Sequence, residues 1–75
     1  MFHTIKFTGD LTVHLEVSPK QHLEWIRFCK GDRLQAQIKP YVVESEDGPV
    51  EVADLIFEDG TTTRRVPFNS FSFVD

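Results

Sequence analysis

The 75-residue sequence contains a single cysteine, Cys29. One cysteine cannot form an internal disulfide, which excludes the stapling that stabilises many small secreted domains. No apolar run approaches the roughly 18 residues needed to span a membrane. The first residues also lack the basic-then-apolar layout of a signal peptide. These absences predict a cytoplasmic protein that has no membrane partner.

Basic residues are also scarce, because eight Lys and Arg against twelve Asp and Glu give a net charge of −4. This charge disfavours nonspecific nucleic-acid binding, which depends on neutralising phosphates. Bases outnumber acids between Lys20 and Lys39, whereas the stretch from Glu44 to Asp59 has seven acids and no base. Either the two stretches lie side by side and neutralise each other, or the acidic stretch is a docking surface for a basic partner.

Motifs that mark catalysis or metal binding are missing. Cys29 has no histidine at a fixed spacing, and we interpret it as a small buried hydrophobe. His14 shares a strand face with Glu16, but zinc sites are marked by paired ligands at tight spacing, so we interpret His14 as an exposed surface residue. We therefore expect no cofactor, no metal and no catalytic residue, and favour a noncatalytic protein over an enzyme.

The residues that are present predict an all-β protein. Each of the four glycines has an aspartate neighbour, and such pairs favour tight turns; they are Gly9-Asp10, Gly31-Asp32, Asp47-Gly48 and Asp59-Gly60. The segments between them are rich in Val, Ile, Phe and Thr, which favour strands. We expect one domain over residues 1–75, formed by five or six short strands. A small barrel is favoured because closure protects strand edges.

Two hairpins can be predicted in detail. Alternating apolar residues over 11–17 predict a half-buried strand, and a three-residue loop at 8–10 would make a hairpin over Phe2–Val17 with Ile5 opposite Val13. The last hairpin turns at Asp59-Gly60. A two-residue loop there would pair Ile56 with Thr63, make Asp54 and Arg65 neighbours on the outer face, and put Ala53, Leu55 and Phe57 on one face with Val66.

Residues 18–31 allow two interpretations. Ser18 and Pro19 resemble the start of a helix, which Gly31 would end. The stretch from Trp25 to Phe28 instead favours a strand. We predict a loop over Ser18–His22 and a strand near Glu24–Cys29, with one short helix near residues 19–29 as the alternative.

The C-terminal third resembles a known fold. The stretch Val66-Pro67-Phe68-Asn69-Ser70-Phe71-Ser72-Phe73-Val74 resembles the end of a Src-homology-3-like (SH3-like) barrel, where a strand meets a proline, makes one helical turn and returns as a short closing strand. Lys30–Leu34 resembles the opening of a strand in such barrels. The resemblance implies an SH3-like barrel. It does not imply binding of proline-rich peptides, because the acidic-aromatic first loop and the paired tryptophans of those members are missing.

Aromatic residues are numerous for so small a core and suggest a contact surface. The candidate binding residues are Trp25, Tyr41, Phe68, Phe71 and Phe73, and simple core packing is the alternative role for each. We predict a noncatalytic module that binds another protein or forms a homo-oligomer. The alternatives are a nucleic-acid-binding barrel that uses Arg27, Phe28, Lys30 and Arg33, and a subunit of an oligomeric enzyme with a site between subunits.

Self-association is predicted through the C-terminal strand. Between Pro67 and Asp75 no residue is charged, which leaves a strand edge unguarded. Phe71 and Phe73 lie two residues apart and so point to one face. The alternative is that both phenylalanines close the barrel and that this strand pairs with the first one.

Overall fold

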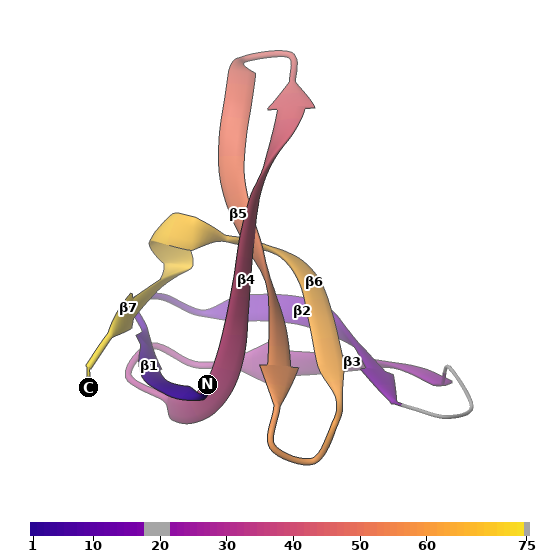
Figure 1. Cartoon of the computed structure of the whole chain (residues 1–75), viewed down its shortest axis with the longest axis vertical. Coiled ribbons are helices and arrows are strands. Elements are labelled where there is room, and N and C mark those ends of the chain that lie inside the picture. The colour runs from indigo at the N-terminus through magenta and orange to yellow at the C-terminus, as the bar shows by residue number, and fades with distance from the viewer. Residues whose placement is uncertain (18–21, 75) are drawn as a thin grey trace.

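The computed structural model describes residues 1–17 and 22–74, which form one antiparallel β-sheet with a single turn of 3₁₀ helix (Figure 1). The elements are β1 (His3–Phe7), β2 (Leu11–Val17), β3 (His22–Phe28), β4 (Arg33–Ser45), β5 (Gly48–Phe57), β6 (Thr62–Pro67), η1 (Phe68–Ser70) and β7 (Phe71–Phe73). The all-β prediction is confirmed, and the described residues form seven strands where five or six were expected.

The seven strands follow the order β3-β2-β6-β5-β4-β1-β7. The sheet curls strongly. In Figure 1, β1 and β7 lie to the left of the β4–β5 hairpin, whereas β2 and β3 extend to its right. The edge strands β3 and β7 are not paired with each other. The fold is therefore an open half-barrel with two strand edges, rather than a fully closed barrel.

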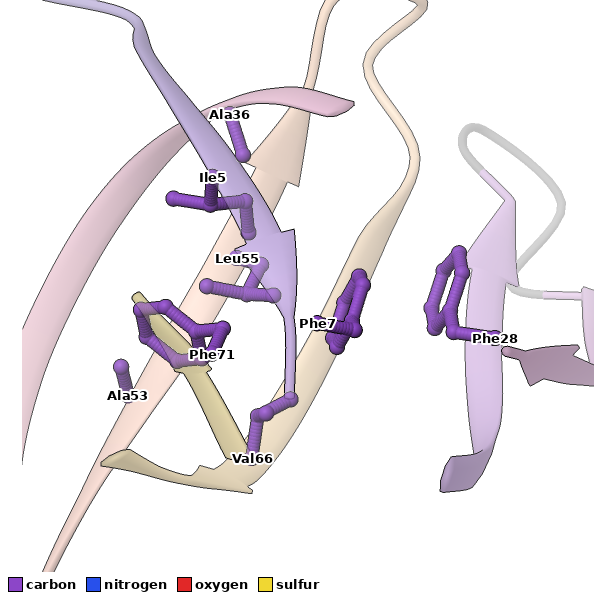
Figure 2. Close-up of a cluster of buried hydrophobic side chains, with 8 residues drawn as sticks. All are labelled: Ile5, Phe7, Phe28, Ala36, Ala53, Leu55, Val66 and Phe71. Atoms are coloured by element: carbon purple, nitrogen blue, oxygen red, sulfur yellow. The ribbon is translucent and has the colours of Figure 1, made fainter. Parts of the chain in front are cut away.

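The core lies on the concave face of this sheet (Figure 2). Eight buried side chains form it, from five strands on one side and β3 on the other: Ile5, Phe7, Phe28, Ala36, Ala53, Leu55, Val66 and Phe71. Phe28 reaches across the curl and stacks on Phe7 with ring centroids 4.5 Å apart. Because Phe7 belongs to β1, this stack links β3 to β1. Phe7 is itself almost fully buried.

The β4–β5 hairpin is much longer than the body of the sheet requires. Its outer half, residues 42–51, projects away from the other strands in Figure 1, and we call it the arm. Gly48 at its turn has φ +104°, a conformation that only glycine adopts without strain. The arm carries Glu44, Glu46, Asp47 and Glu51 at the opposite end of β4 from Arg33. The acids of the arm thus lie away from Arg33, whereas Asp54 of the same acidic stretch is paired in register with Lys39 of the basic stretch.

The predicted hairpin over Phe2–Val17 is wrong. Ile5 is buried, as its alternation suggested, but it pairs with Leu34 of β4 and Phe73 of β7, whereas Val13 pairs with Ile26 of β3. The chain leaves β1 at a corner held by the loop after β3. There the Phe7 N–H donates to the Asp32 carbonyl at 2.9 Å. Alternation thus identified the buried face but could not identify the partner strand.

The β5–β6 hairpin forms, but its register differs from the prediction near the turn. Ile56 pairs with Thr62 rather than Thr63, because the Phe57 N–H bonds to the Thr61 carbonyl and leaves three residues in the loop. A bulge opposite Asp54 then restores the predicted register at Ala53↔Val66. The expected shared face is confirmed, since the side chains of Ala53, Leu55 and Val66 are in the core and Phe57 packs against them.

Residues 22–28 form strand β3, which confirms the strand predicted near Glu24–Cys29 and excludes the alternative helix there. The loop expected at Ser18–His22 falls mainly on residues 18–21, outside the described residues, and His22 already belongs to β3. At the C-terminus, β6 ends at Pro67, η1 makes one turn and β7 pairs with β1. The expected pairing of the last strand with the first is therefore confirmed, whereas the expectation that Phe71 and Phe73 both close the barrel is wrong, because the sheet stays open and Phe73 is 46% exposed.

Candidate functional site

The five candidate binding residues occupy three separate places. Phe68, Phe71 and Phe73 meet at η1 and β7, whereas Trp25 lies on β3 at the other edge of the sheet and Tyr41 lies on β4. Phe71 is only 5% exposed and belongs to the core. The structure therefore brings together three of the five residues, of which Phe68 and Phe73 reach the surface.

The aromatic side chains around β7 form a continuous cluster. Phe68 lies 5.4 Å from Phe71 and 6.4 Å from Phe73 between ring centroids, and the Phe71 and Phe73 rings are 6.1 Å apart. His3 of β1 meets Phe73 edge-on at 5.4 Å. Edge-to-face contacts of this kind favour a defined arrangement of rings. The Phe73 ring thus contacts three other rings while 46% of that residue remains exposed.

Backbone pairing fixes one edge of β7 and leaves the other open. Along β1, Phe71 faces Phe7 and Phe73 faces Ile5, and the Val74 N–H extends the pairing by donating to the Thr4 carbonyl at 3.0 Å. No strand among residues 1–17 and 22–74 pairs with the opposite edge. Ser72 at the middle of β7 is exposed. We call the open side of β7, together with Phe68, Phe73 and Val74, the aromatic edge.

A shallow groove continues from the aromatic edge toward the arm. It encloses about 470 Å³ and is lined by Pro49, Val50, Glu51, Pro67, Phe68 and Asn69. Its walls are mostly apolar, and Val50 is 40% exposed. The sequence did not identify Pro49 or Val50 as surface contacts, because they follow the acidic turn and carry no periodic signal of their own.

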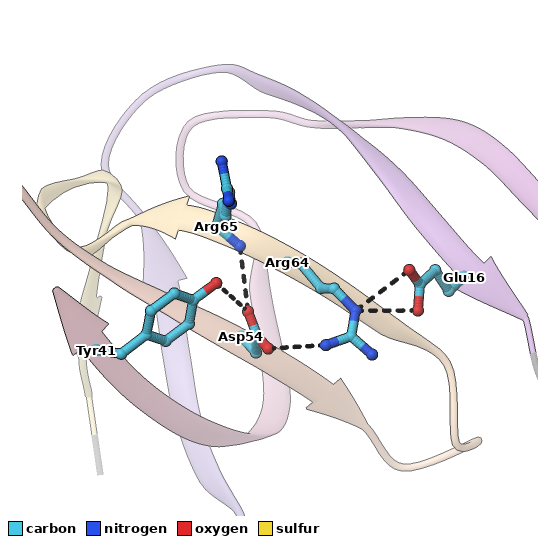
Figure 3. Close-up of polar contacts among 5 residues, drawn as sticks. All are labelled: Glu16, Tyr41, Asp54, Arg64 and Arg65. Atoms are coloured by element: carbon cyan, nitrogen blue, oxygen red, sulfur yellow. Dashed lines mark hydrogen bonds and ion pairs between the residues drawn. The ribbon is translucent and has the colours of Figure 1, made fainter. Parts of the chain in front are cut away.

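Tyr41 has a structural role in a polar cluster on the face of the sheet opposite the core (Figure 3). Its hydroxyl donates to Asp54 Oδ1 at 2.8 Å, and this bond, followed by desolvation, raises the pKa of Tyr41. Arg64 bridges the second oxygen of Asp54 at 3.2 Å and Glu16 at 3.1 Å. The Glu16 carboxylate is the main cause of the raised pKa of Arg64.

The same cluster corrects the predicted pair of Asp54 and Arg65. Asp54 Oδ1 accepts a hydrogen bond from the Arg65 backbone N–H at 3.2 Å, while the ion pair is made by Arg64. Arg65 has φ +57°, and its side chain points away from the carboxylate (Figure 3). The predicted side-chain pair is therefore wrong. Asp54 lies opposite a bulge, where it contacts the Arg65 backbone and the Arg64 guanidinium.

Trp25 is the most exposed aromatic residue of the five, at 70%. Its ring rests against His14 of β2, with centroids 3.6 Å apart. His14 is exposed, as predicted from its place in the alternation. Trp25 therefore marks a surface on the strand at the opposite end of the strand order from Phe73.

Other chemistry finds little support in the described part of the chain. Cys29 is exposed, so its interpretation as a buried hydrophobe is wrong. No three His, Cys, Asp or Glu side chains of the described residues are grouped so that they could hold a metal ion. The basic surface suggested for nucleic acid is weakened, because Phe28 is buried and Arg27 is paired with Asp10 at 2.8 Å.

No described helix combines the length and the apolar character that crossing a membrane requires. Comparison with protein families, with curated proteins and with solved structures finds no match.

Proposed function

We propose that the protein is a noncatalytic assembly module whose contact surface is the aromatic edge and whose partner is a second copy of itself. One observation carries the proposal: β7 has an edge that no described strand pairs with, its Phe73 is half-exposed, and it carries no charged side chain. Natural edge strands are commonly protected by charge, proline or bulges, and an unprotected edge pairs readily with another strand.

The sequence of β7 is suited to pairing with itself. Phe71-Ser72-Phe73 reads the same in both directions. In a two-fold symmetric dimer the same patch is used by both subunits. If two β7 strands pair antiparallel about Ser72, Phe73 of one chain lies beside Phe71 of the other. Cross-strand aromatic pairs stabilise a sheet by roughly 0.2–1 kcal/mol each, and the small Ser72 side chain lets the backbones meet.

The proposed contact is small, which sets its strength. A three-residue strand with a few flanking side chains buries less than the ~1,200 Å² at the lower end of stable interfaces. The dimer should therefore be weak and depend on concentration. Because the surface is apolar, added salt should change its stability little.

We further infer that the half-barrel is SH3-like and that it works in the cytoplasm. The order of strand, Pro67, helical turn and short closing strand supports the first inference. The exposed thiol of Cys29 supports the second, since free exposed thiols persist in reducing compartments.

Sedimentation equilibrium over micromolar to millimolar concentrations tests the proposal. We expect the average mass to rise from the 8.7 kDa of one chain toward twice that value. The variant Ser72→Lys should stay monomeric, because a lysine at the centre of the edge blocks pairing. Thr12→Lys is the matched control, as it adds the same charge at an exposed position of β2, and it should associate as the natural chain does.

A natural chain that stays monomeric throughout this range would contradict the proposal. So would association that Ser72→Lys and Thr12→Lys weaken equally, because the effect would then follow from net charge rather than from the β7 edge. Circular dichroism of both variants, compared with the natural chain, establishes that each remains folded.

A further inference from the structure

The half-barrel has a second open side, between β3 and the start of β4. An apolar hollow of about 330 Å³ lies there, and its lining residues come from β2, β3, β4 and the β5–β6 hairpin: Leu15, Ile26, Phe28, Leu34, Gln35, Phe57, Glu58, Asp59 and Thr61. Five of the nine lining residues are hydrophobic. The hollow continues the core, since Ile26, Leu34 and Phe57 pack against it but stay partly exposed.

An unpaired strand edge borders this hollow. β3 pairs with β2 over its whole length, from Leu11↔Phe28 to Val17↔His22, and no other described strand pairs with its outer edge. Side chains of a strand alternate between the two faces of its sheet. Ile26 and Phe28 therefore face the hollow, while Trp25 and Arg27 project from the opposite face of β3. The side chains of a strand placed beside β3 would contact Ile26 and Phe28 on one face and Trp25 and Arg27 on the other.

We propose that this hollow and the outer edge of β3 bind an extended peptide of another protein, which adds a strand to the sheet. Strand addition provides main-chain hydrogen bonds for affinity, and pockets for alternate side chains provide selectivity. The peptide that fits has apolar side chains at two alternate positions, which enter the hollow, and basic residues at one end. This inference concerns a different edge from β7 and does not depend on self-association.

Acidic residues at the rim of the hollow favour a peptide that has a basic end. Glu58 and Asp59 lie at the rim of the hollow, and both are exposed. Asp59 accepts hydrogen bonds from the Thr61 hydroxyl and the Thr61 N–H, which hold the pKa of its carboxyl below the usual range. Opposite charges placed around a contact favour the correct partner and its orientation.

The hollow has a suitable size for this task. Pockets that bind small ligands enclose about 300–1,000 Å³, and this one lies at the lower end of that range. It has room for a few apolar side chains rather than for a large cofactor. Trp25 is 70% exposed on the other face of β3. It offers a flat apolar surface for the peptide residue that lies between the two apolar positions.

Three synthetic peptides test the proposal. The first alternates valine and threonine and ends in two lysines, the second ends in two glutamates instead, and the third carries proline at two central positions, which prevents ladder hydrogen bonds. Each is titrated into the ¹⁵N-labelled chain and followed by NMR. We expect the lysine peptide to shift the amide signals of β3, Leu34 and Phe57 together with the Trp25 indole signal. The glutamate peptide should bind about tenfold more weakly, and the proline peptide should cause no shift.

A charge reversal at the rim provides the matched control. Glu58→Lys should weaken binding of the lysine peptide and strengthen binding of the glutamate peptide. Glu46→Lys, the same change at the tip of the arm, should alter the binding of neither peptide. Shifts that are equal for all three peptides, shifts confined to residues away from β3 and the hollow, or no shift at millimolar lysine peptide would each overturn the proposal. The Ser72→Lys variant should bind the lysine peptide normally, which separates this site from the aromatic edge.

Discussion

At the scale of single residues, Thr63 stands out because it is fully buried and its hydroxyl oxygen has no hydrogen-bond partner among the described residues. An unpaired buried polar group costs about 1–3 kcal/mol of stability. Valine has nearly the same shape without the hydroxyl, so Thr63→Val should stabilise the fold by about 1 kcal/mol.

Urea denaturation measures this effect from the free energy of unfolding. Thr62→Val, at the half-buried neighbouring position, is the control and should change stability by less than about 0.5 kcal/mol. A loss of stability in Thr63→Val would show that the hydroxyl has a partner, such as a buried water, and would contradict this account of the core.

Asp10 makes the corner after β1 sensitive to acid. Its carboxylate accepts the Lys30 N–H at 2.9 Å and pairs with Arg27 at 2.8 Å, and these contacts, the Lys30 bond first, lower the pKa of Asp10. A carboxyl whose folded pKa lies below its unfolded value stabilises the fold above the unfolded pKa. That contribution is lost as the pH falls through the folded pKa.

A carboxyl NMR titration should therefore place the midpoint of Asp10 below the usual aspartate range. Asp10→Asn removes the titrating group, and its stability should fall less between neutral and strongly acidic pH than that of the natural chain. An ordinary Asp10 midpoint in the folded protein would show that the contacts with Lys30 and Arg27 are not maintained in solution.

At the scale of elements, the β5–β6 bulge stores backbone strain at Arg65. A non-glycine residue at φ +57° costs of order 1 kcal/mol, whereas glycine adopts this conformation freely. Arg65→Gly should therefore leave stability within about 0.5 kcal/mol or raise it, because relief of strain offsets the greater freedom of the unfolded chain.

Arg64→Gly provides the contrast for this prediction. It places glycine at a residue without positive φ and removes the bridge between Glu16 and Asp54, so it should destabilise the fold more than Arg65→Gly does. Thermal and urea denaturation compare the two variants. Equal destabilisation by both would contradict the proposed strain at Arg65.

Elements were predicted well wherever local chemistry decides them. The strand at 22–28 and the turn at Gly48 follow from residue types and their immediate neighbours, whereas the β6–η1–β7 order was expected from the resemblance to SH3-like barrels. The partner of β1 could not be predicted, because the alternating pattern shows only that Ile5 faces the core. It does not show which apolar strand lies beside β1. The bulge at Arg65 was missed for a related reason, because the bond from the Arg65 N–H to Asp54 across the hairpin cannot be inferred from the residues around Arg65.

The candidate site was predicted in part, and for the same physical reasons. The uncharged stretch after Pro67 indicated an unguarded strand, and β7 has an open edge. Composition could not separate the core role of Phe71 from the exposure of Phe73, because pairing with β1 sets the depth of each ring. The hollow beside β3 was not foreseen, since Ile26, Leu34 and Phe57 meet only through the curl of the sheet.

At the scale of the whole molecule, the half-barrel leaves two strand edges without partners among the described residues. They lie at opposite ends of the strand order and differ in character. The β7 edge is short, apolar and symmetric in sequence, which suits a second copy. The β3 edge borders an apolar hollow with an acidic rim, which suits an extended peptide with a basic end. The two proposals therefore use different edges of one chain and do not compete for the same surface.

The central claim is that two chains pair through β7, and isotope-filtered nuclear Overhauser spectroscopy tests it most directly. A millimolar mixture of ¹³C-labelled and unlabelled chains reports only contacts between different molecules. The account predicts intermolecular signals between the rings of Phe73 and Phe71 and between the Ser72 α-protons of the two chains. A spectrum without intermolecular signals, or with signals only from the arm or from β3, would contradict it.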